Sequence, residues 1–66
     1  MKISIKQLSY GHIQDRVTWL EQNIGERKYV LHNHSGGLGW RYHNNDRVIE
    51  IEDEHWATMY VLKWGV

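Results

Sequence analysis

The chain of 66 residues contains no cysteine, proline or phenylalanine, and its formal net charge is zero because eight acidic residues balance eight basic ones. Without cysteine, neither a disulfide bond nor a cysteine-ligated zinc site can stabilise the fold. No apolar run approaches the roughly 20 residues that a membrane-spanning helix needs, and no signal-peptide pattern is present. The zero net charge disfavours a strongly basic nucleic-acid-binding protein. These absences predict a single small globular domain over residues 1–66, located in the cytoplasm.

Aromatic residues are abundant in this short chain, which has four tryptophans and four tyrosines. Each such ring can bury about 150–250 Å² of surface, so a few of them can fill much of a small core. Tryptophan and tyrosine are also the residues that most often anchor protein–protein interfaces. We expect most of the eight rings in the core and one or two exposed as anchors for a partner.

The first third of the chain predicts a strand followed by a helix. Isoleucines alternate with polar residues over positions 1–6, which is the period of a half-buried strand. A helix is expected over residues 10–24, because four apolar residues recur on one helical face. These four residues are Ile13, Val17, Leu20 and Ile24. Ser9 is a suitable N-cap, and Gly25 is placed to end the helix in the left-handed conformation.

The middle of the chain predicts three strands joined by short turns. Residues 29–34 and 40–43 are rich in β-branched and aromatic residues, and the glycine-rich stretch 35–39 lies between them. This pattern predicts a hairpin centred near Gly36 and Gly37. After a turn signal at 44–46, apolar and polar residues alternate over 47–52, which indicates another strand.

The last segment fits two structures. Asp53 can cap a helix over Glu54–Trp64, in which Ala57, Tyr60, Val61 and Trp64 share one face. The alternative is a strand over 58–64, and we prefer the helix. The predicted fold is therefore an α+β two-layer sandwich, β-α-β-β-β-α, with an antiparallel sheet and the helices on one face.

Three histidines form a candidate metal site. His32 and His34 are two residues apart, so on a strand they would point to the same side, and His43 could face them across the hairpin. Three imidazoles would suit zinc. A one-residue slip in register would separate them, and histidines lining the solvent side of the sheet explain the same pattern. We prefer that interpretation and predict neither a metal ion nor another cofactor.

Motifs for catalysis are absent from the sequence. The glycine-rich run 36–39 differs from a phosphate-binding loop, because a strand rather than a helix follows it. No nucleophile motif is present, and a chain of this length has little room for the usual pocket of about 300–1,000 Å³. We predict that the protein is not an enzyme.

Single-stranded nucleic acid is an alternative ligand, because basic and aromatic residues together can form a stacking platform. The candidate residues are Lys28, Tyr29, Trp40, Arg41, Tyr42 and Arg47. Residues 46–66 carry five acidic and two basic residues and would repel phosphates. The charge distribution therefore disfavours nucleic acid as a partner.

The acidic residues gather near the end of the chain. They are Asp46, Glu50, Glu52, Asp53 and Glu54. A solvated strand face together with helix capping accounts for all of them. The functional alternative is an acidic patch that recognises a basic surface on a partner.

Several blocks of residues resemble a known group of proteins. They are Trp19-Leu20-Glu21-Gln22-Asn23-Ile24-Gly25, Leu31-His32-Asn33, Gly36-Gly37-Leu38-Gly39-Trp40, Ile49-Glu50-Ile51-Glu52-Asp53-Glu54, Ala57-Thr58 and Leu62-Lys63-Trp64. Together these blocks are similar to the small uncharacterised proteins of tailed bacteriophages, notably cyanophages. The resemblance implies a phage-encoded protein that acts in the bacterial host cytoplasm and binds a host protein. It assigns no functional residues.

We predict a non-enzymatic protein-binding module whose partner surface is the sheet face left open by the helices. Its candidate residues are Trp40, Tyr42 or Arg41, according to strand register, together with the acidic pair Glu50 and Glu52. The partner is expected to be a host protein, a second copy of the chain, or both. A homodimer would cover the face that a two-layer fold leaves bare.

Overall fold

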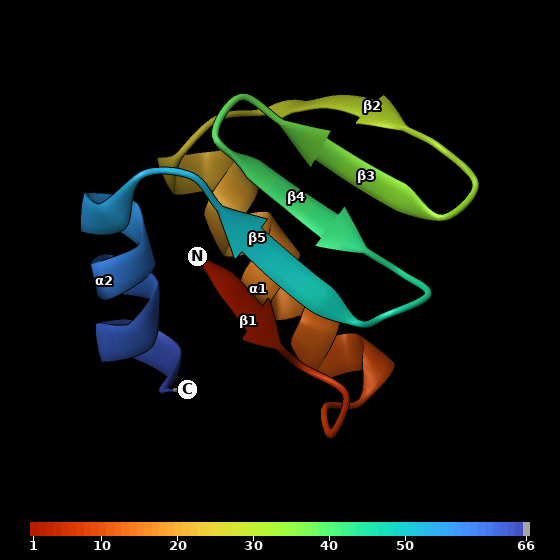
Figure 1. Cartoon of the computed structure of the whole chain (residues 1–66), viewed down its shortest axis with the longest axis horizontal. Coiled ribbons are helices and arrows are strands. Elements are labelled where there is room, and N and C mark those ends of the chain that lie inside the picture. The colour runs from red at the N-terminus through yellow and green to blue at the C-terminus, as the bar shows by residue number, and fades with distance from the viewer. Residues whose placement is uncertain (66) are drawn as a thin grey trace.

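The computed structural model describes residues 1–65, which form five strands and two helices (Figure 1). In chain order these are β1 (Lys2–Ser4), α1 (Tyr10–Asn23), β2 (Arg27–Val30), β3 (His34–Gly37), β4 (Trp40–His43), β5 (Val48–Ile51) and α2 (Glu54–Trp64). The predicted α+β class with an antiparallel sheet is confirmed. Within residues 1–65, no helix is long and apolar enough to cross a membrane.

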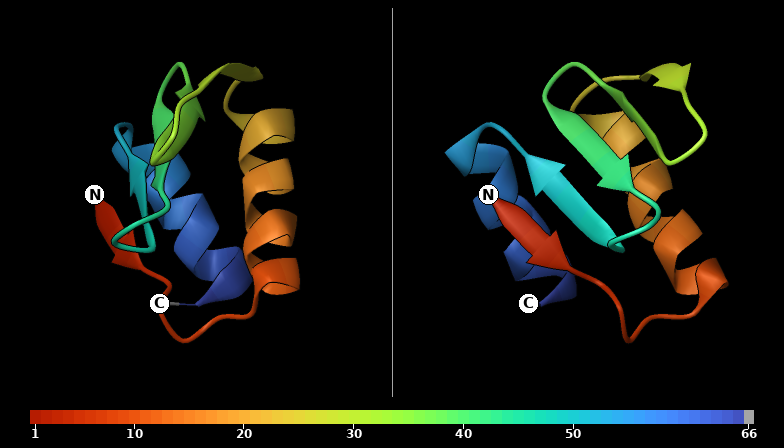
Figure 2. Two further views of the ribbon diagram at one scale, coloured as in Figure 1. Left: turned by 90° about the vertical axis from the view of Figure 1, so that its right-hand side faces the viewer. Right: turned by 45° about the vertical axis from the view of Figure 1, so that its right-hand side comes forward.

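The strands lie in the order β1-β5-β4-β3-β2, and every neighbouring pair is antiparallel. The first strand of the chain therefore forms one edge of the sheet, beside the last strand, and β2 forms the other edge. Both helices lie on the same side of the sheet (Figure 2). The opposite side, here called the open face, is covered by neither helix.

Helix α1 follows its apolar stripe. Ile13, Val17 and Leu20 are buried, and Ile24 is partly buried against the same core. Ser9 is the N-cap as predicted, although its side chain makes no capping hydrogen bond. The prediction of a left-handed Gly25 is wrong, because the positive-φ glycines of residues 1–65 are Gly39 and Gly65. The helix closes instead through Ile24, whose N–H donates to the Leu20 carbonyl at 2.9 Å.

The helical interpretation of Glu54–Trp64 is confirmed. The Asp53 side chain accepts hydrogen bonds from the backbone N–H groups of His55 (2.8 Å) and Trp56 (3.3 Å), so it caps the first turn. Ala57 and Tyr60 are buried on the predicted face. A strand in this segment would form neither these capping bonds nor a single buried face with Ala57 and Tyr60.

The hairpin differs from its prediction. Gly36 and Gly37 lie inside β3 and the turn falls at Leu38 and Gly39, so one additional strand is present. Gly39 supplies the positive φ of 89° that this turn requires. At Gly36 the neighbouring strand leaves no room for a side chain, because an added Cβ would lie 2.6 Å from the Trp40 carbonyl oxygen. Glycine therefore suits this position inside the sheet.

The core lies between the sheet and the two helices. The sheet contributes Ile3, Ile49, Ile51 and other buried side chains. The helices meet through Trp19 of α1, whose ring packs edge-to-face against Trp56 and Tyr60 of α2, both at 6.1 Å between centroids. At the β1–β5 end of the sheet, Ile3, Ile49 and Ile51 are buried beneath the helices.

Candidate partner-binding surface

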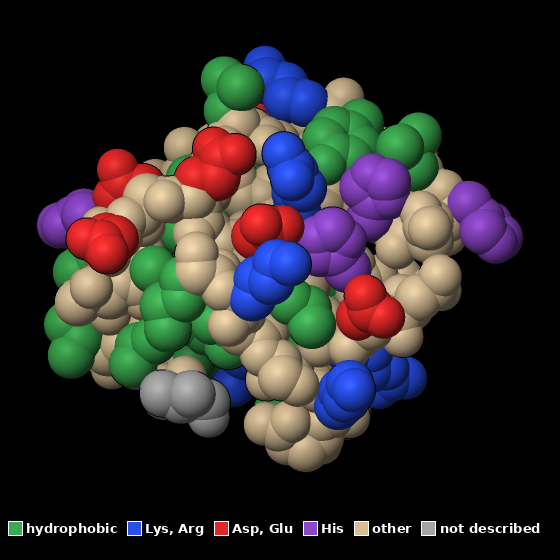
Figure 3. All heavy atoms as spheres, in the orientation of Figure 1, with side chains coloured by type: hydrophobic (Ala, Val, Ile, Leu, Met, Phe, Trp, Pro, Cys, Tyr) green, Lys and Arg blue, Asp and Glu red, His purple; other side chains and the backbone are tan. Residues whose placement is uncertain are grey.

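The open face is polar, and strand register determines which residues it displays. Lys2 pairs with Glu50, and Glu50 pairs with Arg41, so a positive, a negative and a positive side chain lie in one row across three strands. Figure 3 shows charged and histidine side chains gathered over the centre of this face. Three of the five predicted surface residues, Arg41, Glu50 and Glu52, belong to this group.

The other two predicted surface residues are not available on this face. Trp40 is 1% exposed and Tyr42 is 9% exposed, because both point toward the helices. The Trp40 indole Nε1–H donates to the Gly25 carbonyl at 2.7 Å, and the Tyr42 hydroxyl donates to Asn44 Oδ1 at 3.2 Å. Burial raises the pKa of Tyr42 above its usual value. The expectation that these two rings are exposed anchors is wrong, because alternation along β4 sends Arg41 to the open face and its neighbours to the core.

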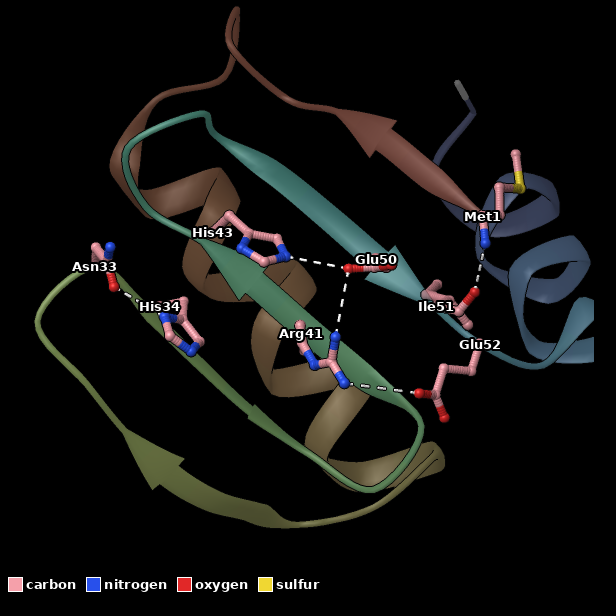
Figure 4. A network of polar contacts seen from close by, with 8 residues as sticks. All are labelled: Met1, Asn33, His34, Arg41, His43, Glu50, Ile51 and Glu52. Atoms are coloured by element: carbon pink, nitrogen blue, oxygen red, sulfur yellow. Dashed lines mark hydrogen bonds and ion pairs between the residues drawn. The ribbon is translucent and has the colours of Figure 1, made fainter.

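Glu50 is the centre of the polar network (Figure 4). Its Oε1 lies 3.1 Å from His43 Nε2 and 3.8 Å from an Arg41 guanidinium nitrogen. The hydrogen bond from His43 is the largest cause that lowers the pKa of the Glu50 carboxyl below its usual value, and Lys2 and Arg41 act in the same direction. The second Arg41 guanidinium nitrogen lies 3.8 Å from Glu52. Arg41 thus links the carboxylate of Glu50 in β5 to that of Glu52, which directly follows the strand.

The structure assembles two of the three candidate histidines. His34 and His43 are direct cross-strand partners, and their rings stack at 5.8 Å between centroids. The ring nitrogen Nδ1 of His34 lies 2.8 Å from Asn33 Oδ1. His32 lies in the loop between β2 and β3, exposed to solvent. The three-histidine set is therefore not formed, and residues 1–65 contain no group of three His, Asp or Glu side chains placed to hold a metal ion.

Tyr29 is the one predicted platform ring that lies on the open face. It pairs with Gly36, where an added Cβ would lie 2.9 Å from the Tyr29 hydroxyl, so the ring covers this glycine. The ring also packs edge-on against His34 at 5.5 Å. With Trp40 and Tyr42 in the core, the aromatic platform expected for single-stranded nucleic acid is reduced to one ring.

The acidic cluster divides between two roles. Glu50 and Glu52 lie on the open face, whereas Asp53 caps α2 and Glu54 lies in its first turn. Asp46 is exposed in the turn before β5. Only the two strand glutamates therefore remain as candidates for a recognition surface.

A second surface feature was missed at the sequence level. A groove of about 260 Å³ lies between the β2 edge and α1, and three exposed apolar residues, Tyr10, Val30 and Leu31, line it. Tyr10 begins a helix and Val30 ends a strand, so sequence alone assigned both to regular elements. The available signal was the unusual apolar pair Val30 and Leu31 at the end of a strand that carries no other aliphatic residue.

No family model, curated protein or solved structure matches this chain. The resemblance to small proteins of tailed bacteriophages therefore stays a prediction based on the residue blocks quoted above. Function is inferred from the surfaces of the chain itself.

Proposed function

We propose that this protein is a non-enzymatic protein-binding module and that its open face contacts the partner. Arg41, Glu50 and Glu52 supply the charged contacts, with Lys2 and His43 beside them. A rigid sheet holds these side chains in a fixed spacing, and complementary charges on a partner would set the orientation of the complex. The protein would act by binding alone, because the bound domain covers a surface of its partner.

The observation that supports this proposal is the availability of the charges on the open face. The side chains of Arg41 and Glu52 are 48% and 66% exposed, and their ion pair is long at 3.8 Å. Exposed pairs of this kind contribute only about 0–1 kcal/mol to stability. Both charges can therefore exchange their mutual contact for a contact with a partner at little cost to the fold.

A host protein is the partner that the phage resemblance favours, with the bacterial cytoplasm as the place of action. A second copy of the chain is the other partner in this proposal. Because the open face is charged rather than apolar, a homodimer through it would depend on cross-pairing of Arg41 with the glutamates of the other copy. Light scattering over a concentration series separates the two: a mass that stays at 7.9 kDa leaves only the foreign partner.

The proposal is tested by reversing the charges of the open face. The double variant Arg41→Glu, Glu52→Lys preserves the net charge and the possibility of an ion pair, but inverts the pattern that a partner reads. We expect it to capture at least about tenfold less partner from bacterial lysate than the original chain, in line with a loss of about 1.4 kcal/mol or more. Captured proteins are quantified by mass spectrometry.

The matched control is Glu54→Lys, Lys63→Glu, which makes the same exchange on α2, away from the open face. Circular dichroism confirms that both variants are folded. Equal capture by the original chain and the open-face variant would contradict the proposed surface. Absence of any specifically captured protein, together with a monomeric mass, would contradict the proposed function.

A further inference from the structure

The outer edge of β2 has backbone groups that no other strand within residues 1–65 pairs. In this part of the chain β2 is bonded to β3 alone, and the Leu31 N–H donates to the His34 carbonyl at 2.7 Å. Along a strand in an antiparallel pair, the backbone N–H and C=O groups of one residue bond to the neighbouring strand, and those of the next residue point away from it. Since Leu31 bonds inward, the N–H and C=O of Val30 face outward from the sheet. Such a free edge is a template for another extended segment.

The side chain of Val30 lies beside the groove. Val30 pairs with Ser35, and Ser35 pairs with Tyr42, whose ring points toward the helices. Val30 therefore shares the helix side of the sheet, and it is 67% exposed there. A residue that pairs with Val30 from outside would project its own side chain to the same side. It would enter the groove, between Tyr10 and Leu31, which are 72% and 55% exposed.

The groove contains one permanent positive charge, the Arg27 guanidinium. His32 and His34 also line it, and none of the lining residues among positions 1–65 carries a carboxylate. Glu21 of α1 bonds to one guanidinium nitrogen of Arg27 at 2.7 Å, and the Arg27 side chain remains 32% exposed with its other donors free for a second acceptor. In an added strand, the residues two positions before and after the one that pairs with Val30 also direct their side chains toward the groove. Acidic side chains at these positions would meet Arg27 at one end and His32 at the other.

We propose that the β2 edge binds an extended segment of a partner protein, in which an aliphatic residue pairs with Val30 and acidic residues lie two positions to either side. The backbone of the segment adds a sixth strand, the aliphatic side chain fills the groove, and the carboxylates pair with Arg27 and His32. This inference names the class of partner for the protein-binding function proposed above and rests on that function.

The β1 edge does not offer the same combination. β1 has three residues and begins at Lys2, and the Met1 ammonium donates to the Ile51 carbonyl at 2.7 Å. A short edge strand that carries a lysine is a common way to discourage further strand pairing. Its neighbours Ile3 and Ile5 are buried rather than exposed. The two edges therefore differ both in backbone length and in the apolar surface beside them.

The probe for this inference is the peptide acetyl-Thr-Glu-Thr-Leu-Thr-Glu-Thr-amide, titrated into the isotopically labelled full chain and followed by amide chemical shifts. We expect shifts that concentrate on β2, on Leu31 and on the first turns of α1. A peptide with lysine in place of both glutamates tests the charge, and one with a methylated leucine nitrogen tests strand pairing. Each is expected to bind about tenfold more weakly or worse, the equivalent of one lost charged or backbone contact.

Two protein variants complete the test. Val30→Asp places a negative charge at the anchor position and is expected to abolish the shifts, whereas Leu62→Asp makes the same change at an exposed apolar position of α2 and is expected to preserve them. Shifts that survive Val30→Asp, equal binding of the N-methylated peptide, or no shifts at millimolar peptide would each overturn the inference.

The failure of this inference is distinguishable from failure of the proposed function. If Val30→Asp captures the same lysate partner as the original chain while the open-face variant does not, the protein-binding function stands and the β2 edge is not its site. If both variants lose the partner, the two surfaces act together. If neither the original chain nor any variant captures a partner and the chain is monomeric, the proposed function falls with the inference.

Discussion

At the β1–β5 end of the molecule, Ile3, Ile49 and Ile51 lie buried beneath the helices. At the β2 end, Val30 has the same kind of branched side chain on the same side of the sheet, yet it is largely exposed. The chain makes strands at both ends, but α2 packs near β5 and leaves β2 with only the flank of α1 (Figure 1). Strand pairing and core formation are therefore separable in this small fold.

The two ends are also held by different forces. The β1–β5 end is stabilised by burial of aliphatic side chains, which scales with the apolar area removed from water. The β2 end depends on close backbone approach: an added Cβ at Gly37 would meet the carbonyl oxygen of Glu26. Its side-chain contacts are exposed ion pairs, such as Lys28 with Glu26 at 3.2 Å. The β2 end is therefore held by close backbone packing and exposed ion pairs rather than by a buried aliphatic core.

The largest expected effect compares equivalent truncations at the two ends. Ile49→Ala should lower the free energy of unfolding by about 2–5 kcal/mol, because it leaves a cavity in the closed part of the core. Val30→Ala should change it by no more than about 0.5 kcal/mol, since its side chain is already in solvent. Urea denaturation of both variants measures the difference. Similar losses for the two variants would show that the β2 end is as well packed as the other.

A smaller effect tests whether the β2 end relies on backbone approach. Gly37→Ala should destabilise the protein by about 1–3 kcal/mol, because its new methyl group meets backbone that cannot move aside cheaply. The matched control, Gly11→Ala in α1, has open space around the new methyl group. It should stabilise the fold by about 0.5–1 kcal/mol through the higher helix propensity of alanine. Thermal unfolding of the pair provides the measurement, and a neutral Gly37→Ala would argue against tight approach at this end.

The smallest effect concerns the open face between the two ends. Because the pKa of Glu50 is lowered in the folded chain, its contribution to stability is present above the unfolded pKa and is lost as pH falls through the folded pKa. His43→Ala removes the largest cause, so the Glu50 pKa should rise toward its usual value and the acid-induced loss should shrink. The stability change should stay below about 1 kcal/mol, as for other surface pairs. A carbon-detected NMR titration of the Glu50 carboxyl follows the pKa directly; an unchanged value in His43→Ala would exclude His43 as the cause.

The helices could be predicted from sequence because their signals are local. The apolar stripe of α1 and the Asp53 cap of α2 depend only on residues within a few positions of one another. The hairpin could not be predicted in the same way. A run of glycines suits a tight turn as well as a strand pressed against its neighbours, and only the approach of Trp40 and Glu26 to β3 distinguishes the two.

The candidate surface was predicted in part for a related reason. Alternation over residues 48–52 separates Glu50 and Glu52 from Ile49 and Ile51, and the structure has the isoleucines in the core. Alternation does not show which side of a strand faces the helices. Sequence therefore leaves open whether Arg41 or the rings of Trp40 and Tyr42 lie on the open face, and the structure has Arg41 there and both rings in the core.

The two helices, the faces that they bury and the α+β class follow from the sequence without further information, since they depend on periodicities and caps that act over a few residues. The tertiary structure alone decided the strand order, the side of the sheet on which Trp40 lies, the pairing of His34 with His43, and the exposure of the β2 edge. Those features depend on contacts between segments distant in the chain. The energies of these contacts arise only when both helices pack against one face of the sheet. That packing leaves the other face and the β2 edge exposed to solvent.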